Sequence, residues 1–301
     1  MNNSDSKIAF IVTKPLQLLV ALTIYREYCK GHRAVFFIID SFFEANVVAD
    51  RIDKLMSKEI DCKFHKTKKY AYMDVVSHSY SQIFIDSDVG FQNCLWLKFL
   101  KIFNKSLKIN IFEEGKGTYS NDFYVGIKKK MFKLMRIGVL FGDCPATSQI
   151  YLYNPSDYLK KIPYNKHKIV HINTNITESI RSNFTDIATI FGTSDNDFFK
   201  SKKQCRIYLT DWAVDYKFID DFLNLSGDLF IKPHPHITEN FSEFNLNVMK
   251  PGAPFELLIV YFLDIYERID VYDHGSHGSS VRRYINDPKV KFHSIYNNDA
   301  V

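Results

Sequence analysis

Two adjacent glutamates, Glu113 and Glu114, follow the apolar run KINIF and directly precede Gly115. Neighbouring carboxylates repel each other, which raises the pKa of one of them toward the range of a general base. The glycine lets a substrate approach the backbone closely. The stretch predicts either a catalytic carboxylate at a strand end or an ordinary polar turn, and its residues alone leave both interpretations open.

A histidine between two prolines follows another apolar run, in the stretch IKPHPH that contains His234. Proline on both sides fixes the local backbone and removes competing hydrogen-bond donors. An imidazole held in this way could donate to a phosphate or to a leaving group. The alternative is a rigid turn in which the histidine has no chemical role.

Two later stretches have features of a nucleotide site. Glu256 lies in the first turn of a helix that begins near Pro254. It could accept hydrogen bonds from a ribose diol, or it could simply complement the helix dipole. In DHGSHGSSVRRY, the hydroxyls of Ser279 and Ser280 and the amides of a helix start could bind a phosphate without a metal, or Ser could only cap the helix.

Metal and redox centres are poorly supported. The stretches DSD (86–88) and DND (195–197) have the spacing of metal–nucleotide motifs, but a capped turn explains them equally simply. No GxGxxG follows the first strand, and no P-loop motif occurs. The five cysteines are scattered without a CxxC pair, which favours reduced thiols in the cytosol over a zinc ribbon or a thioredoxin-like centre.

The elements that must position these residues alternate along the chain. Short β-rich runs (IAFIVT, AVFFIID, QIFIDSD and KINIF) alternate with helical patterns such as ANVVADRIDKLM. The second half contains the runs QIYLYN, KIVHIN, RIYLTD, DLFIKPHP and DVYDHG. This alternation predicts parallel α/β sheets.

The charged, proline-containing stretch 154–168 is the best candidate for a boundary between two domains. We therefore expect two Rossmann-like domains, 1–155 and 156–301, with the active site in the cleft between them. Since open α/β sheets bind ligands at the carboxyl ends of their strands, TKPLQ, EEGKG, TDWAVD, KPHPH and DHGSHGSS should line that cleft.

The net charge of +5 is too weak to indicate a nucleic-acid partner. Lys14 and Pro15 interrupt the first apolar run, so neither a membrane span nor a signal peptide is expected and the cytoplasm is the predicted location. IKKKMFKLMR could lie on an anionic lipid surface at the inner face of the cytoplasmic membrane, or it could be a solvated helix face. Its cations are Lys128, Lys129, Lys130, Lys133 and Arg136.

Taken in order, several short motifs resemble those of bacterial sialyltransferases. They are Glu113-Glu114-Gly115, Lys232-Pro233-His234-Pro235, Pro254-Phe255-Glu256 and Ser279-Ser280. The opening TKPLQLLVA resembles the TPLQ start of the lipooligosaccharide sialyltransferase family (glycosyltransferase family 52), with Lys14 standing between the threonine and the proline. The resemblance covers nearly the whole chain as an ordered set of motifs.

This resemblance implies a GT-B fold and an inverting, metal-independent transfer of sialic acid from CMP-sialic acid. The expected acceptor is a terminal galactose-type sugar of a bacterial surface glycan, such as lipooligosaccharide, O-antigen or capsule. No cofactor is implied, and a homodimer is left open. The C-terminal domain would hold the CMP-sugar, and the N-terminal domain would face the acceptor.

The resemblance also implies a role for each matching residue. One of Glu113 and Glu114 would be the base, and His234 would stabilise or protonate the departing phosphate. The expected donor contacts are Lys232, His234, Pro235, Glu256, Gly278, Ser279 and Ser280, and those on the acceptor side are Thr13, Gln17 and Gly115.

Alternatives remain for both the base and the function. Asp211 and Asp215, in LTDWAVD, follow another predicted strand and could serve as the base. Another GT-B glycosyltransferase with a different nucleotide sugar is the second function. A non-catalytic protein that binds nucleotide sugars or acidic glycans is the third.

Overall fold

The computed structural model describes residues 7–120, 123–193, 203–211, 213–234, 237, 239, 241, 243–244, 246–274 and 279–295. The chain divides into two compact units, Met1–Asn175 and Ile176–Val301.

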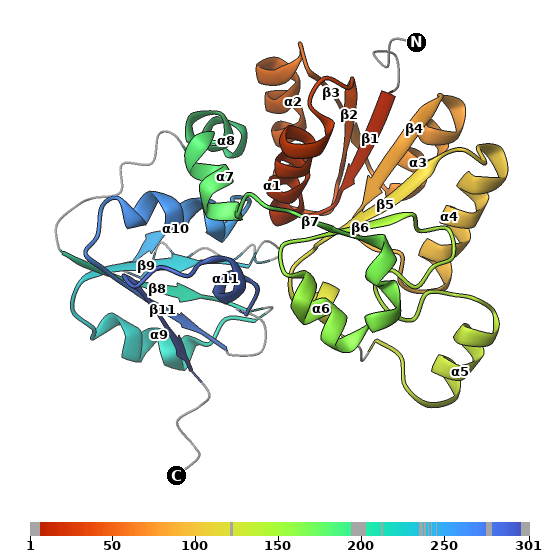
Figure 1. The fold of residues 1–301 in the computed structure, drawn as a ribbon. Helices are drawn as coiled ribbons and strands as arrows, with labels where there is room; N and C mark the ends of the chain where they lie inside the picture. The colour runs from red at the N-terminus through yellow and green to blue at the C-terminus, as the bar shows by residue number, and fades with distance from the viewer. Residues whose placement is uncertain are drawn as a thin grey trace. The chain divides into compact units, whose positions relative to one another are not determined.

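The N-terminal unit is built on a seven-stranded parallel sheet with the order β3-β2-β1-β4-β5-β6-β7 (Figure 1). Its strands are β1 (Lys7–Val12), β2 (Ala34–Ile39), β3 (Ile60–His65), β4 (Tyr80–Ile85), β5 (Lys108–Phe112), β6 (Gln149–Leu152) and β7 (Ile169–His171). The chain builds outward from β1 in one direction and then returns to β1's other side with β4. This reversal is the topological switch point at which open α/β sheets place their ligands.

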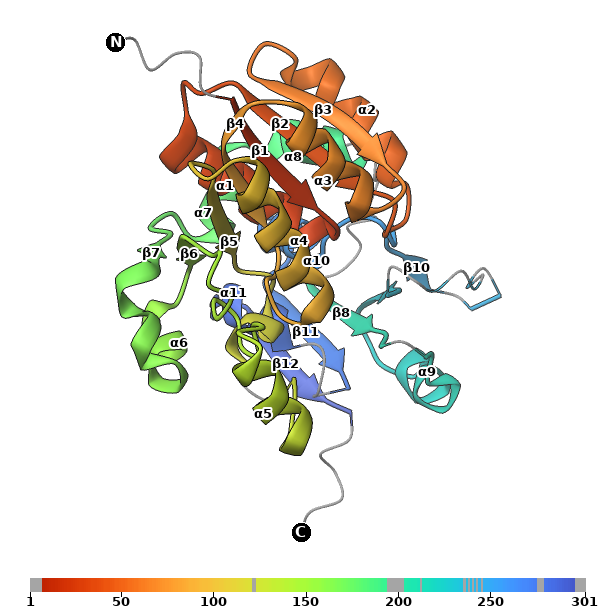
Figure 2. The same ribbon diagram turned by 90° about the vertical axis from the view of Figure 1, so that its right-hand side faces the viewer.

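Helices cover both faces of this sheet (Figure 2). They are α1 (Pro15–Ile24) with its π-helical extension η2 (Tyr25–Cys29), α2 (Ala45–Met56), α3 (Lys68–Ser77), α4 (Phe91–Phe103), η3 (Lys116–Tyr119), α5 (Gly126–Leu134), α6 (Pro155–Lys161) and η4 (Pro163–Lys168). Because both faces are covered, the central strands are continuous apolar runs, and all six residues of β2 are buried. Pro15 lies at the first position of α1, where its fixed φ suits a helix start.

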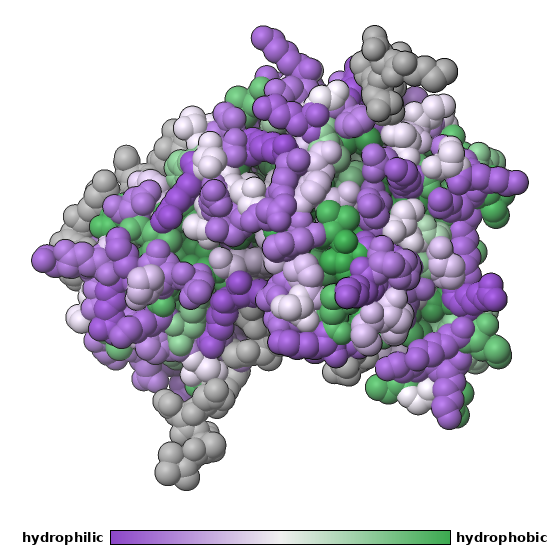
Figure 3. Space-filling view, viewed as in Figure 1, coloured by the Kyte–Doolittle hydropathy of each residue, from purple (hydrophilic) through white to green (hydrophobic). Residues whose placement is uncertain are grey.

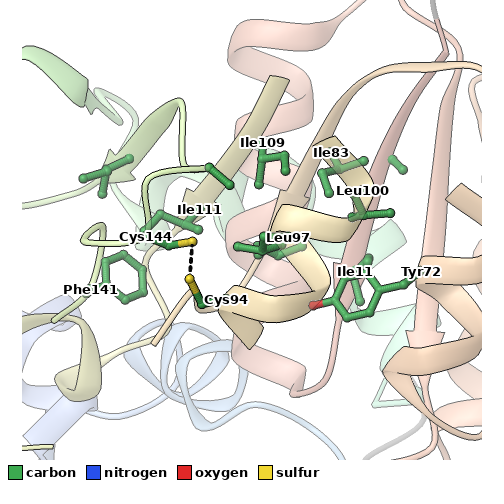
Figure 4. Close-up of a cluster of buried hydrophobic side chains, with 14 of the residues drawn as sticks. Ile11, Tyr72, Ile83, Cys94, Leu97, Leu100, Ile109, Ile111, Phe141 and Cys144 are labelled. Carbon is green, nitrogen blue, oxygen red and sulfur yellow. Dashed lines mark hydrogen bonds between the residues drawn. The ribbon is translucent and has the colours of Figure 1, made fainter. Parts of the chain in front are cut away.

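The core on one side of the sheet joins β1, β4 and β5 to α3 and α4. Ile11, Ile83 and Ile109 pack there with Leu97 and other side chains (Figure 4). Two buried thiols belong to the same core: the sulfurs of Cys94, on α4, and Cys144 lie 2.8 Å apart. These contacts fix α4 and the segment before β6 against the sheet.

The C-terminal unit has a five-stranded parallel sheet with the order β10-β9-β8-β11-β12. Its strands are β8 (Gln204–Leu209), β9 (Asp228–Lys232), β10 (Asn247–Val248), β11 (Arg268–Asp273) and β12 (Val290–Ser294). Its helices are α7 (Ile176–Ser182), α8 (Phe184–Phe191), α9 (Tyr216–Leu223), α10 (Phe255–Leu263) and α11 (Ser279–Tyr284). One of its cores packs Tyr208, Ile219, Phe222 and Ile231.

The boundary predicted after residue 155 was wrong, because the N-terminal unit extends to Asn175. The run KIVHIN, assigned from the sequence to the second half, supplies β7, which pairs with β6 of the first sheet. The charged stretch 154–168 is not a linker either. It folds as α6 and η4, and Tyr158 within it is fully buried.

Candidate functional site

Polar side chains gather where β1, β4 and β5 end in the N-terminal unit. Thr13 follows β1, Asp86 follows β4, and Glu114 follows β5 after one intervening residue. The Thr13 hydroxyl oxygen lies 2.9 Å from both Asp86 Oδ2 and Gln17 Oε1. Because β1 and β4 are neighbours across the switch point, these contacts tie the two strand ends together.

Asp86 is the centre of this network. It is almost fully buried and accepts a hydrogen bond from Gln17 Nε2 at 3.2 Å, while Lys68 Nζ lies 2.5 Å from Oδ1. Burial alone would raise the pKa of Asp86, but the Lys68 ammonium and the hydrogen bonds from Lys68 and Thr13 outweigh it and lower the pKa. Asp86 is therefore a fixed negative charge. It fits the role of an anchor better than that of a base.

Glu113 faces the interior of the unit. Its side chain is fully buried, and its carboxylate accepts hydrogen bonds from the Tyr119 hydroxyl at 2.5 Å and from the Tyr153 amide at 2.9 Å. Its own amide donates to the carbonyl of Tyr151, which continues the pairing of β5 with β6. These contacts make Glu113 a support for the loop that carries its neighbour.

Glu114 is held differently. Its carboxylate lies 3.3 Å from the ammonium of Lys14, and 16% of its side chain is exposed. Burial raises the pKa of Glu114 above the ordinary carboxyl value; Lys14 opposes this shift, and Asp86 adds to it. A raised pKa makes a carboxylate a stronger proton acceptor, and its exposed part leaves it open to a substrate hydroxyl, as a general base requires.

Two glycines shape the loop around Glu114. Gly115 has φ 110° and ψ −145°, a conformation that only glycine adopts readily, so it allows the chain to turn away from β5. A Cβ placed on Gly117 would lie 2.7 Å from Glu114 Oε1. The space left by the missing side chain of Gly117 is therefore occupied by the carboxylate of Glu114.

The DSD stretch serves the fold. Asp88 is fully buried and accepts hydrogen bonds from the amides of Gly142 and Cys144 and from the hydroxyl of Thr147, at 2.7 to 3.0 Å. Both aspartates of this motif are thus used inside the unit, as expected of an anchored turn. The described part of the chain contains no group of three or more His, Cys, Asp or Glu side chains suited to a metal. The DND stretch lies outside the described residues.

In the C-terminal unit, the ends of β8 and β9 meet at His234. Its amide donates to the hydroxyl of Thr210 at 2.8 Å, and its carbonyl accepts from the amide of Ile237 at 2.9 Å. The side chain of His234 is half-buried. These two backbone hydrogen bonds hold the turn, and the imidazole keeps access to solvent.

The two aspartates considered as alternative bases differ. Asp215 caps helix α9, because its Oδ1 accepts from the amide of Phe218 at 3.0 Å. This cap accounts for Asp215 without a catalytic role. Asp211 directly follows Thr210 and is half-buried, so it stays an alternative to Glu114.

Lys232 and Glu256 are both buried, and their charges influence each other. Burial lowers the pKa of Lys232 to about 7 and raises that of Glu256 to about 7, and each charge partly offsets the shift of the other. Lys232 Nζ donates to the carbonyls of Pro233 and Pro251, at 3.0 and 2.9 Å. This geometry makes Lys232 a support for the loop of His234 rather than a donor contact.

Arg282, on α11, is a residue that the sequence analysis did not single out. It forms a bidentate pair with Asp273, which ties α11 to the end of β11. Ser279 and Ser280 begin α11, but their side chains, like Pro235 and Gly278, lie outside the described residues.

Two more residues near Glu114 were missed. Asp86 had a signal, since it directly follows the apolar run QIFI, but it was considered only as a metal ligand or as part of a capped turn. Lys68 had none, because nothing in its surroundings in the sequence links it to Asp86. Its ion pair joins the start of α3 to the end of β4.

No family model and no curated protein matches the sequence. Solved structures do match over most of the chain. Arabidopsis thaliana UGT89C1, complexed with UDP, is 10% identical with a TM-score of 0.50, over 91% of this chain and 77% of its own. The wall teichoic acid polymerase TagF with CDPG is 10% identical with a TM-score of 0.50, over 88% of this chain and 65% of its own.

UDP-GlcNAc 2-epimerase from Neisseria meningitidis, bound to UDP-GlcNAc, is also 10% identical, with a TM-score of 0.49, over 89% of this chain and 78% of its own. The likeness to UGT89C1 and TagF, together with the two parallel sheets, shows a GT-B type of fold with two Rossmann-like units. The expected fold class is confirmed.

Proposed function

We propose that the protein is a glycosyltransferase that moves sialic acid from CMP-sialic acid to a hydroxyl of a bacterial surface glycan. The observation that carries the proposal is Glu114, a partly exposed carboxylate with a raised pKa at the carboxyl end of β5. The GT-B fold and the resemblance to the motifs of bacterial sialyltransferases support the choice of reaction and donor.

In the proposed reaction, Glu114 takes the proton from the acceptor hydroxyl as its oxygen attacks the anomeric carbon. The bond between that carbon and the phosphate oxygen of CMP breaks, and its electron pair leaves with the phosphate. The configuration is inverted because attack and departure occur on opposite faces. The ammonium of Lys14 lies 3.3 Å from the Glu114 carboxylate, holds it in place and opposes the rise in its pKa that burial causes.

On the donor side, His234 would stabilise or protonate the departing phosphate. The bonds of its backbone to Thr210 and Ile237 hold the residue in one position, so little reorganisation is needed during the reaction. Glu256 would accept from the ribose. A monophosphate leaving group stabilised by such donors needs no metal, and metal-independent transfer is part of the proposal.

A donor other than CMP-sialic acid is the second candidate. Two of the structural neighbours were solved with UDP and with CDPG, so a nucleoside-diphosphate donor fits the fold equally well. A non-catalytic protein that binds nucleotide sugars is the third. It would show no turnover, and its ligand binding would survive replacement of both Glu113 and Glu114.

The test is release of CMP from CMP-sialic acid by the purified protein, with lactose or N-acetyllactosamine as acceptor and EDTA present. Turnover that resists EDTA and falls in both Glu114→Gln and His234→Ala supports the proposal. Turnover only with UDP-sugars supports the second candidate. Binding of CMP-sialic acid without turnover supports the third.

A prediction for the loop concerns Gly117→Ala. The added methyl group would overlap Glu114 Oε1, and the flexible carboxylate, not the backbone, would move. We expect kcat to fall by about tenfold to a hundredfold, as misplacement of a catalytic group by about 1 Å does, with little change in melting temperature. Steady-state kinetics and thermal unfolding measure the two effects. An unchanged kcat would show that Glu114 needs no defined position.

The pH dependence of kcat tests the role of Lys14. The ammonium of Lys14 lowers the pKa of Glu114, so Lys14→Met should raise this pKa further. A base works when it is deprotonated, and the rising acidic limb of the pH profile should therefore move to higher pH in the variant. If the acidic limb does not move, the group that titrates in the profile is not Glu114.

A further inference from the structure

Helix α5 exposes apolar side chains on the face turned away from the protein. Its partly buried side, through Phe132, packs against the core of the N-terminal unit. Ile127, Met131 and Leu134 follow one another at helical spacing on another face, and Ile127 and Leu134 are 82% and 86% exposed. A soluble helix normally turns its apolar stripe inward, so this arrangement is the reverse of the usual one.

Helix α4 continues this exposed surface. Phe91, Leu95 and Ile102 lie on its outer side, and Ile102 is 72% exposed. The two helices are neighbours: Lys98 Nζ of α4 lies 3.5 Å from the carbonyl of Met135, just after α5. We call this region the α4–α5 surface; its exposed apolar residues are Phe91, Leu95, Ile102, Phe103, Val125, Ile127, Met131, Leu134 and Met135.

The charge of the same region is strongly positive. Residues 91–103 and 126–136, which are α4 and α5 with the two residues after α5, contain seven Lys or Arg and no Asp or Glu, a formal charge of +7, whereas the whole chain carries +5. Lys130, Lys133 and Arg136 of this region are exposed. Figure 3 shows hydrophilic and hydrophobic side chains side by side at the lower right, where Figure 1 places α5. The surface thus combines cations with apolar side chains that can enter an apolar phase.

We propose that the α4–α5 surface docks the protein onto a membrane that contains anionic lipids. Lysines and arginines would bind the headgroups, and Ile127, Leu134 and their neighbours would enter the boundary between headgroups and acyl chains. Lys128 Nζ lies over the rings of Tyr124 and Phe132, at 5.1 and 5.7 Å, which keeps its charge beside the apolar stripe. The proposed contact is peripheral. None of the helices that the structure describes has the length and apolar character of a membrane span.

A second copy of the chain fits this surface less well. A symmetric dimer through the α4–α5 surface would bring the same patch of each copy together. Two pairs of helices that each carry a formal charge of +7 would then face each other, and like charges disfavour such a contact. An anionic lipid surface offers the opposite charge and an apolar phase together.

The test is co-sedimentation of the full chain with vesicles, without any nucleotide sugar, so that its outcome does not depend on the proposed reaction. We expect binding to vesicles of phosphatidylcholine with phosphatidylglycerol and little binding to phosphatidylcholine alone. Raising the salt from about 0.1 M to about 0.5 M should weaken it, because salt screens exposed charges. Equal binding to both vesicle types, or none to either, would overturn the proposal.

Two double variants separate the contribution of the cations to vesicle binding from that of the apolar side chains. Lys130→Gln/Lys133→Gln should lower the partition coefficient by roughly 30-fold, and Ile127→Ser/Leu134→Ser by tenfold or more, as expected for two exposed side chains that leave the bilayer. Matched controls are Lys54→Gln/Lys58→Gln and Leu55→Ser, at exposed positions in or just after α2, which should bind as the wild type does. Light scattering tests whether a second copy of the chain covers this surface instead. If the wild type forms a dimer and does not bind vesicles, and Ile127→Ser/Leu134→Ser abolishes the dimer, the surface serves self-association and the proposal is wrong.

Discussion

Replacing Glu114 with Gln is expected to lower kcat by about 10²- to 10⁴-fold, the usual contribution of a general base. The amide fills the same space and can still accept a hydrogen bond from Lys14, but it cannot take a proton from the acceptor. Because the wild-type carboxylate is a desolvated charge with a raised pKa, the variant should be at least as stable as the wild type. Steady-state kinetics and thermal unfolding, measured on the same preparation, test both statements.

Glu113→Gln is the matched control, since it makes the same chemical change one residue earlier. The Glu113 carboxylate accepts from Tyr119 and from the Tyr153 amide through the same oxygen, Oε2, and a neutral amide oxygen in its place is a weaker acceptor than a carboxylate. We expect a loss of about 1–3 kcal/mol of unfolding free energy and a smaller effect on kcat than that of Glu114→Gln. The opposite result, an inactive but stable Glu113→Gln with an active Glu114→Gln, would exchange the two roles.

Asp211→Asn tests the remaining alternative base. If Glu114 is the base, Asp211→Asn should keep kcat within about tenfold of the wild type, because it would remove at most a secondary contact. A loss of kcat as large as that of Glu114→Gln would identify Asp211, after the end of β8, as the base. The same assay with CMP-sialic acid serves for both variants.

The sequence predicted the helices and strands well, but it did not predict which residues of neighbouring strands contact each other. The apolar runs predicted most strands, and Gly115 was correctly expected at the end of one of them. The difference between Glu113 and Glu114 depends on β6, about forty residues later, whose Tyr151 carbonyl accepts from the amide of Glu113. Short-range patterns carry no information on that pairing.

The domain boundary failed for a related reason. Prolines and charges in 154–168 are typical of a linker, but Tyr158 is buried there and β7 completes the first sheet. Only the partner of β7 reveals which domain it belongs to. In the same way, the lysines near residue 130 were visible in the sequence, while the outward direction of Ile127 and Leu134 follows from the packing of Phe132.

Asp86→Ala is expected to lower the free energy of unfolding by about 3–5 kcal/mol, the usual cost of breaking a buried ion pair by removing one partner. The change would leave the Lys68 ammonium, only 26% exposed, without its counter-charge and would remove an acceptor shared by Thr13 and Gln17. Urea denaturation measures the loss. Asp61→Ala, which breaks an exposed pair with Arg33, is the control and should cost at most about 1 kcal/mol.

The pH dependence of stability gives an independent check on Asp86. Because its pKa is lowered in the folded protein, its contribution is present above the ordinary carboxyl pKa and disappears as the pH falls through the lowered value. The difference in stability between the wild type and Asp86→Ala should therefore shrink at acidic pH. Lys68→Met added to Asp86→Ala should recover part of the loss, since no buried ammonium remains. If the two changes were simply additive, Asp86 would stabilise the site through Thr13 and Gln17 rather than through its charge.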